Sequence, residues 1–327
     1  MTGPVRVTRG RQPRDVLHLS FDRKVSPTGT YQASRGRWIP NVPNSFGLPS
    51  GDSCPGMTSF CDSCYAARNE QSAGVRDAVE HNLRMLQAAA DPTAMFVLIR
   101  EMIQRYVAHA DAAKIPPEHR MFRIHWDGDF YSVQYAIVWD AVIAMHPDIS
   151  FWAYTRSFRD PVNVVPVLAD RSNLALYLSV DADNAAAAAS VAAEYPSVRL
   201  AGCAEDYQHA RALLPDREQS AVICPENIGR LELTNEHGVG ACVTCRICPD
   251  DRRDILFSTS HREDAAVPVA ITPRHRPPVV LRPTETVCEN PACGHVIVQR
   301  TGAGRPRKYC DEACRHEAYN IARSVTA

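Results

Sequence analysis

Apolar residues recur every three to four positions through residues 75–109, which is the spacing of an amphipathic helix. The dipeptide Asp91-Pro92 interrupts this pattern, so we expect two helices rather than one. Further helical patterns cover residues 133–146, 160–170 and 183–194. The helical pattern of residues 183–194 is rich in alanine and starts at an Asp or Asn that can cap a helix.

Short apolar runs, typical of buried strands, separate these helices. They cover residues 121–124, 149–154, 174–180, 198–201 and 221–223. Strands that alternate with helices form parallel sheets joined by crossover helices. The predicted fold class is therefore α/β, either as a barrel or as an open sheet.

Composition divides the chain into four predicted regions. Residues 1–40 form a basic, irregular N-terminal arm rich in Pro, Gly, Ser and Arg, and residues 41–264 form the α/β domain that carries the first cysteines. Residues 265–286 contain five prolines and few periodic apolar positions, which is typical of a linker. A small unit, residues 287–327, follows the linker.

Positive charge is concentrated at the two ends of the chain. The protein has 327 residues, of which 36 are Lys or Arg and 37 are Asp or Glu, so its net charge is −1. Residues 1–37 hold eight basic and two acidic residues, and residues 271–327 hold nine and five, which leaves −11 on residues 38–270. Basic ends on an acidic body predict contact with a polyanion such as a nucleic acid. Two solvated termini are the alternative interpretation.

The chain has 12 cysteines and no sign of secretion or membrane insertion. No apolar run approaches the roughly 18–20 residues of a membrane span, and the first residues lack the apolar segment of a signal peptide. We therefore expect a cytoplasmic protein that makes no membrane contact. Disulfides are rare in that setting, so metal or cluster binding is the leading interpretation of the cysteines.

The first cysteine group is Cys54, Cys61 and Cys64, with the spacing C-x6-C-x2-C on a loop just before a helix. Three cysteines on one loop can hold three corners of a 4Fe–4S cluster and leave the fourth iron open. The amino and carboxylate groups of S-adenosylmethionine are one ligand for that iron. The alternative is a structural zinc site completed by a distant Cys or His.

The second cysteine group has the spacing C-x17-C-x2-C-x2-C and consists of Cys224, Cys242, Cys245 and Cys248. Its two successive C-x2-C steps, followed by a proline, look like the cluster loops of bacterial ferredoxins and predict a second 4Fe–4S cluster. A closed zinc site is the alternative. Cys203 stands alone after a strand, and we expect an inert buried thiol or a ligand exchanged into either site.

The third cysteine group predicts a zinc ribbon or treble clef in the C-terminal unit. It consists of Cys288, Cys293, Cys310 and Cys314. A unit of about 40 residues needs such a metal to fold, because its core is too small. The loop 300–308 places four basic residues beside glycines, which suits contact with phosphates. A solvated turn is the alternative, and zinc ribbons also bind proteins.

Polar residues follow several of the predicted strands. Gly128 and Asp129 follow one strand, residues 154–156 end the next, and Ser179 and Asp181 end a third. Because binding sites on parallel sheets lie at the carboxyl ends of the strands, these residues are candidates for ligand binding or catalysis. Turn residues or helix caps are the alternative for each of them.

Three segments carry a resemblance to a known family. Residues 44–65, NSFGLPSGDSCPGMTSFCDSCY, residues 122–142 and residues 151–158 resemble the mycobacteriophage gene-product-88 family over roughly residues 40–260. The ending Cys64-Tyr65-Ala66 is similar to a wider group of phage proteins with a three-cysteine motif. The resemblance implies a phage protein that acts in the bacterial host cytoplasm. The tail segment 309–315, YCDEACR, resembles zinc-binding tails of actinobacterial proteins.

More distantly, the chain resembles the radical S-adenosylmethionine superfamily. This resemblance implies a partial (βα) barrel with a cluster on the cysteine loop and S-adenosylmethionine held by a glycine-rich acidic motif at a strand end. The cofactor-binding residues it implies are Cys54, Cys61, Cys64, Tyr65, Gly128, Asp129 and Ser179, with Asp129 and Asp181 as candidate catalytic residues. The chain departs from the superfamily's C-x3-C-x2-C spacing, and Ser63 stands where an aromatic residue is usual.

Three functions are compatible with these patterns. The first is a radical-S-adenosylmethionine-like iron–sulfur enzyme that acts on a nucleic acid or nucleotide. The second is a non-catalytic phage factor, stabilised by zinc, that binds nucleic acid or protein. The third is base exchange in a metal-containing barrel, which requires a nucleophilic carboxylate at a strand end, and Asp127, Asp129 or Asp181 could serve.

Overall fold

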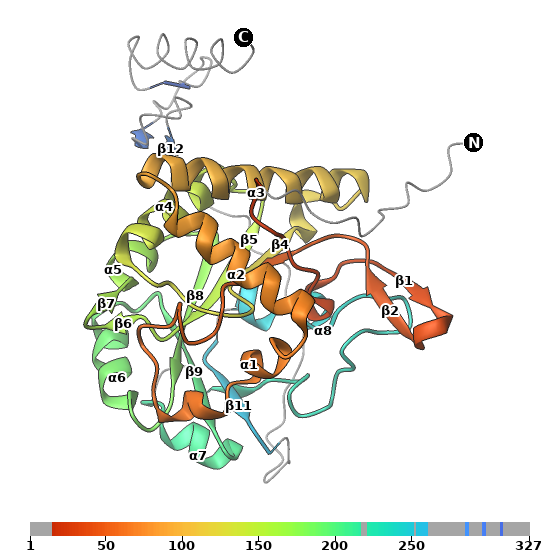
Figure 1. The fold of residues 1–327 in the computed structure, drawn as a ribbon. Helices are drawn as coiled ribbons and strands as arrows, with labels where there is room; N and C mark the ends of the chain where they lie inside the picture. The colour runs from red at the N-terminus through yellow and green to blue at the C-terminus, as the bar shows by residue number, and fades with distance from the viewer. Residues whose placement is uncertain are drawn as a thin grey trace.

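A seven-stranded parallel sheet forms the centre of the protein (Figure 1). The computed structural model describes residues 15–216, 221–251, 253–260, 285–287, 296–298 and 308–309. The strand order is β10-β11-β9-β8-β5-β4-β3, and every neighbouring pair is parallel. These strands are β3 (Ser45–Phe46), β4 (Met121–Ile124), β5 (Ser150–Thr155), β8 (Leu174–Val180), β9 (Arg199–Ala204), β10 (Val222–Ile223) and β11 (Ile255–Ser258).

The strands from β3 to β9 are neighbours in chain order, and β11 then inserts between β9 and β10. Right-handed crossovers that always advance in one direction place their helices on one face of the sheet. The predicted α/β class with a parallel sheet is confirmed. Within the described part of the chain β3 and β10 remain edge strands, so the sheet is not closed into a barrel.

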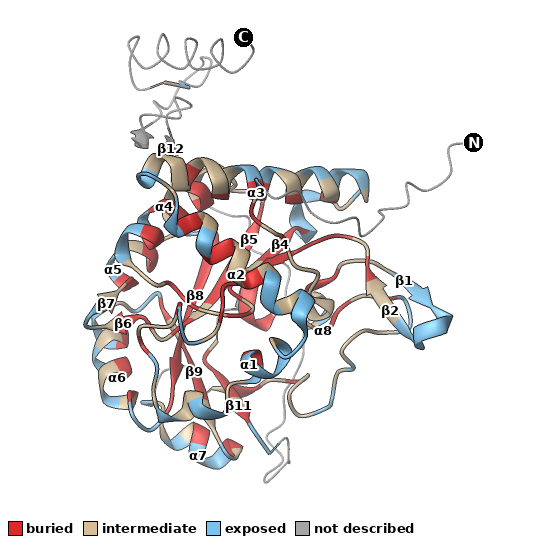
Figure 2. Ribbon diagram, in the orientation of Figure 1, coloured by how far each residue is buried: buried red, intermediate tan, exposed pale blue. Residues whose placement is uncertain are grey.

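Helices cover one face of the sheet. They are α2 (Ala73–Gln87), α3 (Pro92–Ala112), α4 (Val133–Met145), α5 (Val165–Leu168), α6 (Ala185–Glu194) and α7 (Tyr207–Ala212). Most of the core lies between these helices and the sheet, where buried ribbon predominates (Figure 2). Trp139 of α4 packs near Phe122 of β4 in this layer. All seven residues of β8 are buried, because β8 lies between β5 and β9 and because side chains pack on both faces of the sheet there.

The opposite face of the sheet, called here the inner face, is covered differently. Met121, Trp152 and Tyr177 project from β4, β5 and β8 and pack against Val25 and a cysteine-containing segment. That segment comprises α8 (Ala241–Cys245) and a π-helical turn (Ile247–Asp251). Core clusters on both faces therefore sandwich the sheet, and the second cysteine group belongs to the cluster on the inner face.

The two predicted helices around Asp91-Pro92 are confirmed. Helix α3 begins at Pro92, and the Asp91 side chain accepts a 2.8 Å hydrogen bond from the Ala94 amide as its N-cap. Helix α4 begins in the same way after Ser132. The strands 121–124 and 174–180 have the predicted bounds, because burial on both faces gives them continuous apolar runs.

The structure also contains elements that the sequence does not predict. An antiparallel hairpin of β1 (Gly29–Gln32) and β2 (Arg37–Pro40) lies inside the segment expected to be irregular. Gly36, at φ +58°, supplies the left-handed residue that its tight turn requires. The other unpredicted strands are β3, β11, and a short pair, β6 (Phe158–Arg159) and β7 (Val162–Asn163). They have two to four residues, too few for a period to be recognised.

Only short pieces of the C-terminal region are described. Strand β12 (Glu285–Val287) pairs antiparallel with β13 (Val296–Val298), which agrees with the strand pattern in residues 295–299. Cys288, Cys293, Cys310 and Cys314 and almost all of the basic loop lie outside the described residues. The zinc ribbon therefore stays a prediction. Among the described helices, none is long and apolar enough to cross a membrane.

Candidate functional site

A cavity of about 1840 Å³ opens at the carboxyl edge of the parallel sheet. Five strands reach it, because residues at or just after the ends of β4, β5, β8, β9 and β11 line it. Among these strand-end residues are Asp129, Arg156, Ser179, Cys203 and Ser258. The cavity thus brings together several of the polar strand-end residues expected to gather there.

The first cysteine group lines this cavity on a loop between β3 and α2 that contains the short helix α1 (Tyr65–Asn69). Gly128 packs so closely against this loop that a side chain at its position would collide with it. A Cβ atom at Gly128 would lie 2.4 Å from Ser53 Oγ, and its φ of +76° also favours glycine. Ser53 Oγ in turn donates to the Pro49 carbonyl at 2.7 Å. Gly128 therefore serves close packing of the cysteine loop.

Asp181 anchors the same loop from β8. Its Oδ2 accepts a 2.7 Å hydrogen bond from Thr58 Oγ1 and two more from Arg156, at 3.1 and 2.9 Å. Asp183 accepts from both the amide and the hydroxyl of Ser59, at 2.8 and 2.6 Å. Asp181 is almost fully buried and is not among the residues that line the cavity. Its observed contacts are those of a positioning residue.

Asp129 is likewise occupied by the protein itself. Its Oδ1 accepts from Thr155 Oγ1 at 2.6 Å and from the Phe130 amide at 2.7 Å, and its Oδ2 accepts from the Arg156 amide at 2.7 Å. Burial raises the pKa of Asp129, and these three hydrogen bonds oppose that rise. The carboxylate ties the end of β4 to the end of β5.

Asp127 has fewer hydrogen-bond partners than Asp129, the residue expected from the sequence to bind a ligand. Asp127 is 2% exposed and lines the cavity, and no hydrogen bond of ordinary length and angle reaches its oxygens within the described residues, although the Gly128 amide and the Glu70 carboxyl lie close to it. Burial first, and then the nearby Glu70 carboxyl, raise its pKa to about 8. A buried polar group without a partner calls for an explanation, and a ligand that donates hydrogen bonds is one. From the sequence alone, Asp127 was expected only as a candidate nucleophile for base exchange.

His125, which directly follows β4 and lies two residues before Asp127, has a strained backbone. Its φ of +59° is unusual for a residue other than glycine, and such strain clusters at functional sites. Its Nε2 lies 2.9 Å from the Tyr135 hydroxyl, whereas Nδ1 has no partner within the described ranges. Burial lowers the pKa of His125 to about 3, so the ring is neutral.

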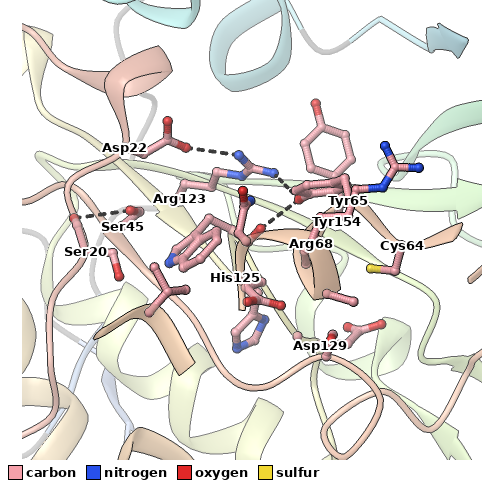
Figure 3. A pocket seen from close by; sticks show the side chains of 18 of the residues that line it. Ser20, Asp22, Ser45, Cys64, Tyr65, Arg68, Arg123, His125, Asp129 and Tyr154 are labelled. Carbon is pink, nitrogen blue, oxygen red and sulfur yellow. Dashed lines mark hydrogen bonds and ion pairs between the residues drawn. The ribbon is translucent and has the colours of Figure 1, made fainter. Parts of the chain in front are cut away.

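Tyr65 links the cysteine loop to β4. Its hydroxyl donates to the Trp126 carbonyl at 2.7 Å and accepts from Arg123 at 3.1 Å. Arg123 also pairs with Asp22 at 3.0 Å, so it lies between Asp22 and Tyr65 on the cavity wall (Figure 3). The tyrosine that follows Cys64 therefore fixes the position of the last cysteine of the loop.

The cavity lining is cationic although the body of the chain is acidic. Three aspartates stand against six basic residues, which are Arg23, Lys24, Arg68, Arg105, Arg123 and Arg156. Aromatic side chains share the lining, among them Phe60, Tyr65, Trp126, Tyr154 and Phe257. Cations beside aromatic rings are suited to phosphate-bearing and ring-containing ligands.

Cys203 lines the cavity beside Arg156. Burial raises its pKa to about 11, while the Arg156 guanidinium lowers it. The second cysteine group packs on the inner face and does not line the cavity. In the described part of the protein, no three His, Cys, Asp or Glu side chains stand in the arrangement of a single-ion site. Metal binding at either group stays a prediction.

The fold and the site define an α/β protein whose cysteine-lined cavity lies at the carboxyl edge of a parallel sheet. The sequence profile of the family described as Gene product 88 matches residues 19–251, and the chain belongs to that family. It is 39% identical to the Gene 88 protein of Mycobacterium phage L5 over 253 residues, which are 75% of this chain and 99% of that protein.

The Gene 88 protein of Mycobacterium phage D29 is 38% identical over 255 residues, again 75% of this chain and 99% of that protein. The resemblance to a mycobacteriophage family is therefore confirmed. No solved structure matches the chain. Both described cysteine groups lie inside the matched residues, whereas the third group lies beyond them.

Proposed function

We propose that this protein is an iron–sulfur enzyme, similar to radical S-adenosylmethionine enzymes, that acts on a nucleotide or nucleic acid. One observation carries the proposal: three thiols of one loop line a large cavity at the carboxyl edge of a parallel sheet. The loop follows the first strand of that sheet, β3, and an acidic segment follows the second, β4. The superfamily that the sequence resembles has the same order. The proposed setting is the cytoplasm of the bacterial host, since the relatives are phage proteins.

The residues of the loop fit a 4Fe–4S cluster. Cys54, Cys61 and Cys64 are soft thiolate donors on a segment that Ser53 and Thr58 fasten to its surroundings. Three ligands leave one iron for S-adenosylmethionine. Bound together, the two cofactors would supply one-electron reductive chemistry that removes a hydrogen atom from the substrate.

We assign Asp127, rather than Asp129, to the amino group of S-adenosylmethionine. No hydrogen bond of ordinary geometry from the described residues reaches its two oxygens, whereas those of Asp129 accept three. An ammonium group beside a buried carboxyl favours the ionised form and offsets the raised pKa. Ser179, on the cavity floor, offers its hydroxyl to a ribose.

The charge of the lining supports an anionic substrate. Six basic side chains face a cavity that also contains aromatic rings, and phosphates with stacked bases satisfy both features. Arg68 and Arg105 lie on helices at the cavity wall, where they can contact a phosphate backbone. The basic termini would extend this contact along a polymer.

Anaerobic reconstitution with iron and sulfide tests the proposal. We expect a brown protein with broad visible absorbance that consumes S-adenosylmethionine when a reductant is added. Cys61→Ala should lose this consumption, and Asp62→Asn, at an exposed neighbour on the same loop that does not line the cavity, should retain it. A protein that consumes no S-adenosylmethionine although its first site holds a cluster would overturn the enzymatic assignment.

A second function is favoured by the cationic lining alone, namely nucleic-acid binding by a zinc-stabilised, non-catalytic protein. The same reconstitution separates the two. Under this alternative the protein stays colourless, retains zinc only, and still binds single-stranded nucleic acid with an affinity that falls as salt rises.

A further inference from the structure

Four cysteines belong to the core cluster on the inner face of the sheet. Cys224 follows β10, Cys242 and Cys245 lie in α8, and Cys248 lies in the π-helical turn. All four are free thiols and pack in one apolar cluster with Met121 and Trp152, among other residues. Cys248 is 9% exposed. Segments 18 positions apart in the sequence thus contribute four cysteines to the same apolar cluster.

The backbone between two of these cysteines is strained and firmly held. Arg246 has a φ of +56°, a left-handed conformation that is costly for a residue with a side chain. Its guanidinium pairs with Asp250 and donates to the Glu118 carbonyl at 3.2 Å. This turn redirects the chain between Cys245 and Cys248. Strain that the surroundings maintain in this way is typical of a functional site.

Positive charge lies close to the same cysteines. Arg123 and Lys24 lie within electrostatic range of Cys242, and so does the Asp22 carboxylate. Four thiolates carry a large negative charge, so neighbouring cations reduce the cost of gathering them. Lys24 is held in place by Glu226 at 2.7 Å, and Arg123 by Asp22.

Tyr154 touches both the cavity and this cysteine group. Its hydroxyl donates to Cys248 Sγ at 3.0 Å, and the same residue lines the cavity. Its ring packs against Tyr177 and Phe257, with centroid distances of 5.2 and 5.8 Å. Hydrogen bonds to ligand sulfur atoms are a main determinant of the reduction potential of an iron–sulfur centre.

We propose that Cys224, Cys242, Cys245 and Cys248 hold a second iron–sulfur cluster on the inner face, whose reduction potential is set in part by the Tyr154 hydroxyl. The spacing favours iron–sulfur over zinc, because one distant cysteine joins a C-x2-C-x2-C run, whereas zinc sites usually combine two separate pairs. Tyr154 is a positioning residue that connects this centre to the cavity. The site is independent of the first cysteine group and of the proposed reaction.

The full-length protein with Cys54, Cys61 and Cys64 all changed to Ser isolates the second centre. After anaerobic reconstitution we expect about four iron and four sulfide per chain, which is one cubane, with broad visible absorbance that reductant bleaches. The reciprocal variant Cys245→Ser should lose this cluster and keep the first. A triple variant that is colourless, or that binds a single zinc, overturns the proposal and leaves the proposed function untouched. Should the triple variant fail to fold, Cys245→Ser decides: unchanged iron content overturns the proposal.

Tyr154→Phe tests the connection to the cavity. A donor hydrogen bond stabilises the more negative, reduced state of a cluster, so its loss should shift the reduction potential of the second centre to a lower value. Tyr177→Phe is the matched control, because Tyr177 packs in the same cluster but its hydroxyl donates to the Arg253 carbonyl at 3.1 Å. An unchanged potential in Tyr154→Phe, or an equal shift in Tyr177→Phe, overturns the role of Tyr154.

Discussion

Thr58 Oγ1 donates a 2.7 Å hydrogen bond to Oδ2 of Asp181, across 123 positions of the sequence. This contact joins the loop of the first cysteine group to the end of β8. Because Asp181 also accepts two hydrogen bonds from Arg156, one buried carboxylate fixes both the loop and a cationic side chain of the cavity wall.

Asp181→Ala should therefore lower the free energy of unfolding by about 3–5 kcal/mol, as expected when one partner of a buried ion pair is removed. The Arg156 side chain would remain mostly buried without its anion. Urea unfolding of the metal-free protein measures this. Asp183→Ala is the control, since Asp183 is exposed, and a loss as large as that of Asp181→Ala would contradict the assignment.

Gly128→Ala should destabilise the protein more than Gly51→Ala. Both glycines have left-handed φ values, +76° and +79°, so each alanine incurs a backbone cost of about 1–2 kcal/mol. Only at Gly128 would the new Cβ also meet Ser53 and Leu48, at 2.4 and 2.7 Å, whereas nothing lies within 4 Å at Gly51. Thermal unfolding of the two variants compares them, and equal melting temperatures would disprove tight packing at Gly128.

The contribution of Asp127 to the free energy of unfolding should fall as the pH rises from 4 to 8. Its pKa is about 8 in the folded protein and near the ordinary aspartate value of 3.8 in the unfolded chain, so the folded state binds more protons throughout this window. Asp127→Asn should remove this part of the pH dependence and raise the free energy of unfolding at pH 8 by a few kcal/mol, on the order set by about 1.4 kcal/mol for each pKa unit.

Urea unfolding at pH 5 and pH 8 measures that difference. Asp129→Asn is a useful comparison, because the Asp129 oxygens accept three hydrogen bonds and its amide form would lose acceptor capacity. Parallel pH profiles for the natural protein and Asp127→Asn would show that Asp127 does not titrate in this window.

Arg68→Ala should weaken binding of single-stranded DNA and reduce the slope of log affinity against log salt by about one. Arg68 lines the cavity, whereas Arg76, exposed on α2, does not. Fluorescence anisotropy over a salt series compares the two, and Arg76→Ala should retain both the affinity and the slope. Equal losses in the two variants would place the nucleic acid elsewhere.

Much of the architecture could be predicted from local pattern. The break at Asp91-Pro92 and the buried strand β8 depend on residues close in sequence, so the period and the cap are visible without a fold. The hairpin of β1 and β2 could not be predicted in this way, because each strand has four residues and is mostly exposed.

The features of the candidate site likewise separate into those that depend on nearby residues in the sequence and those that depend on distant ones. The sequence by itself determined that the cysteines form separate groups and that acidic residues follow β4 and β8. Only the tertiary structure decided that Asp129 and Asp181 accept several hydrogen bonds, that no bond of ordinary geometry from the described residues reaches the Asp127 oxygens, and that Cys203 lines the cavity. The physical reason is that hydrogen-bond satisfaction depends on donors far away in the chain, such as Thr58 for Asp181, which no local pattern records.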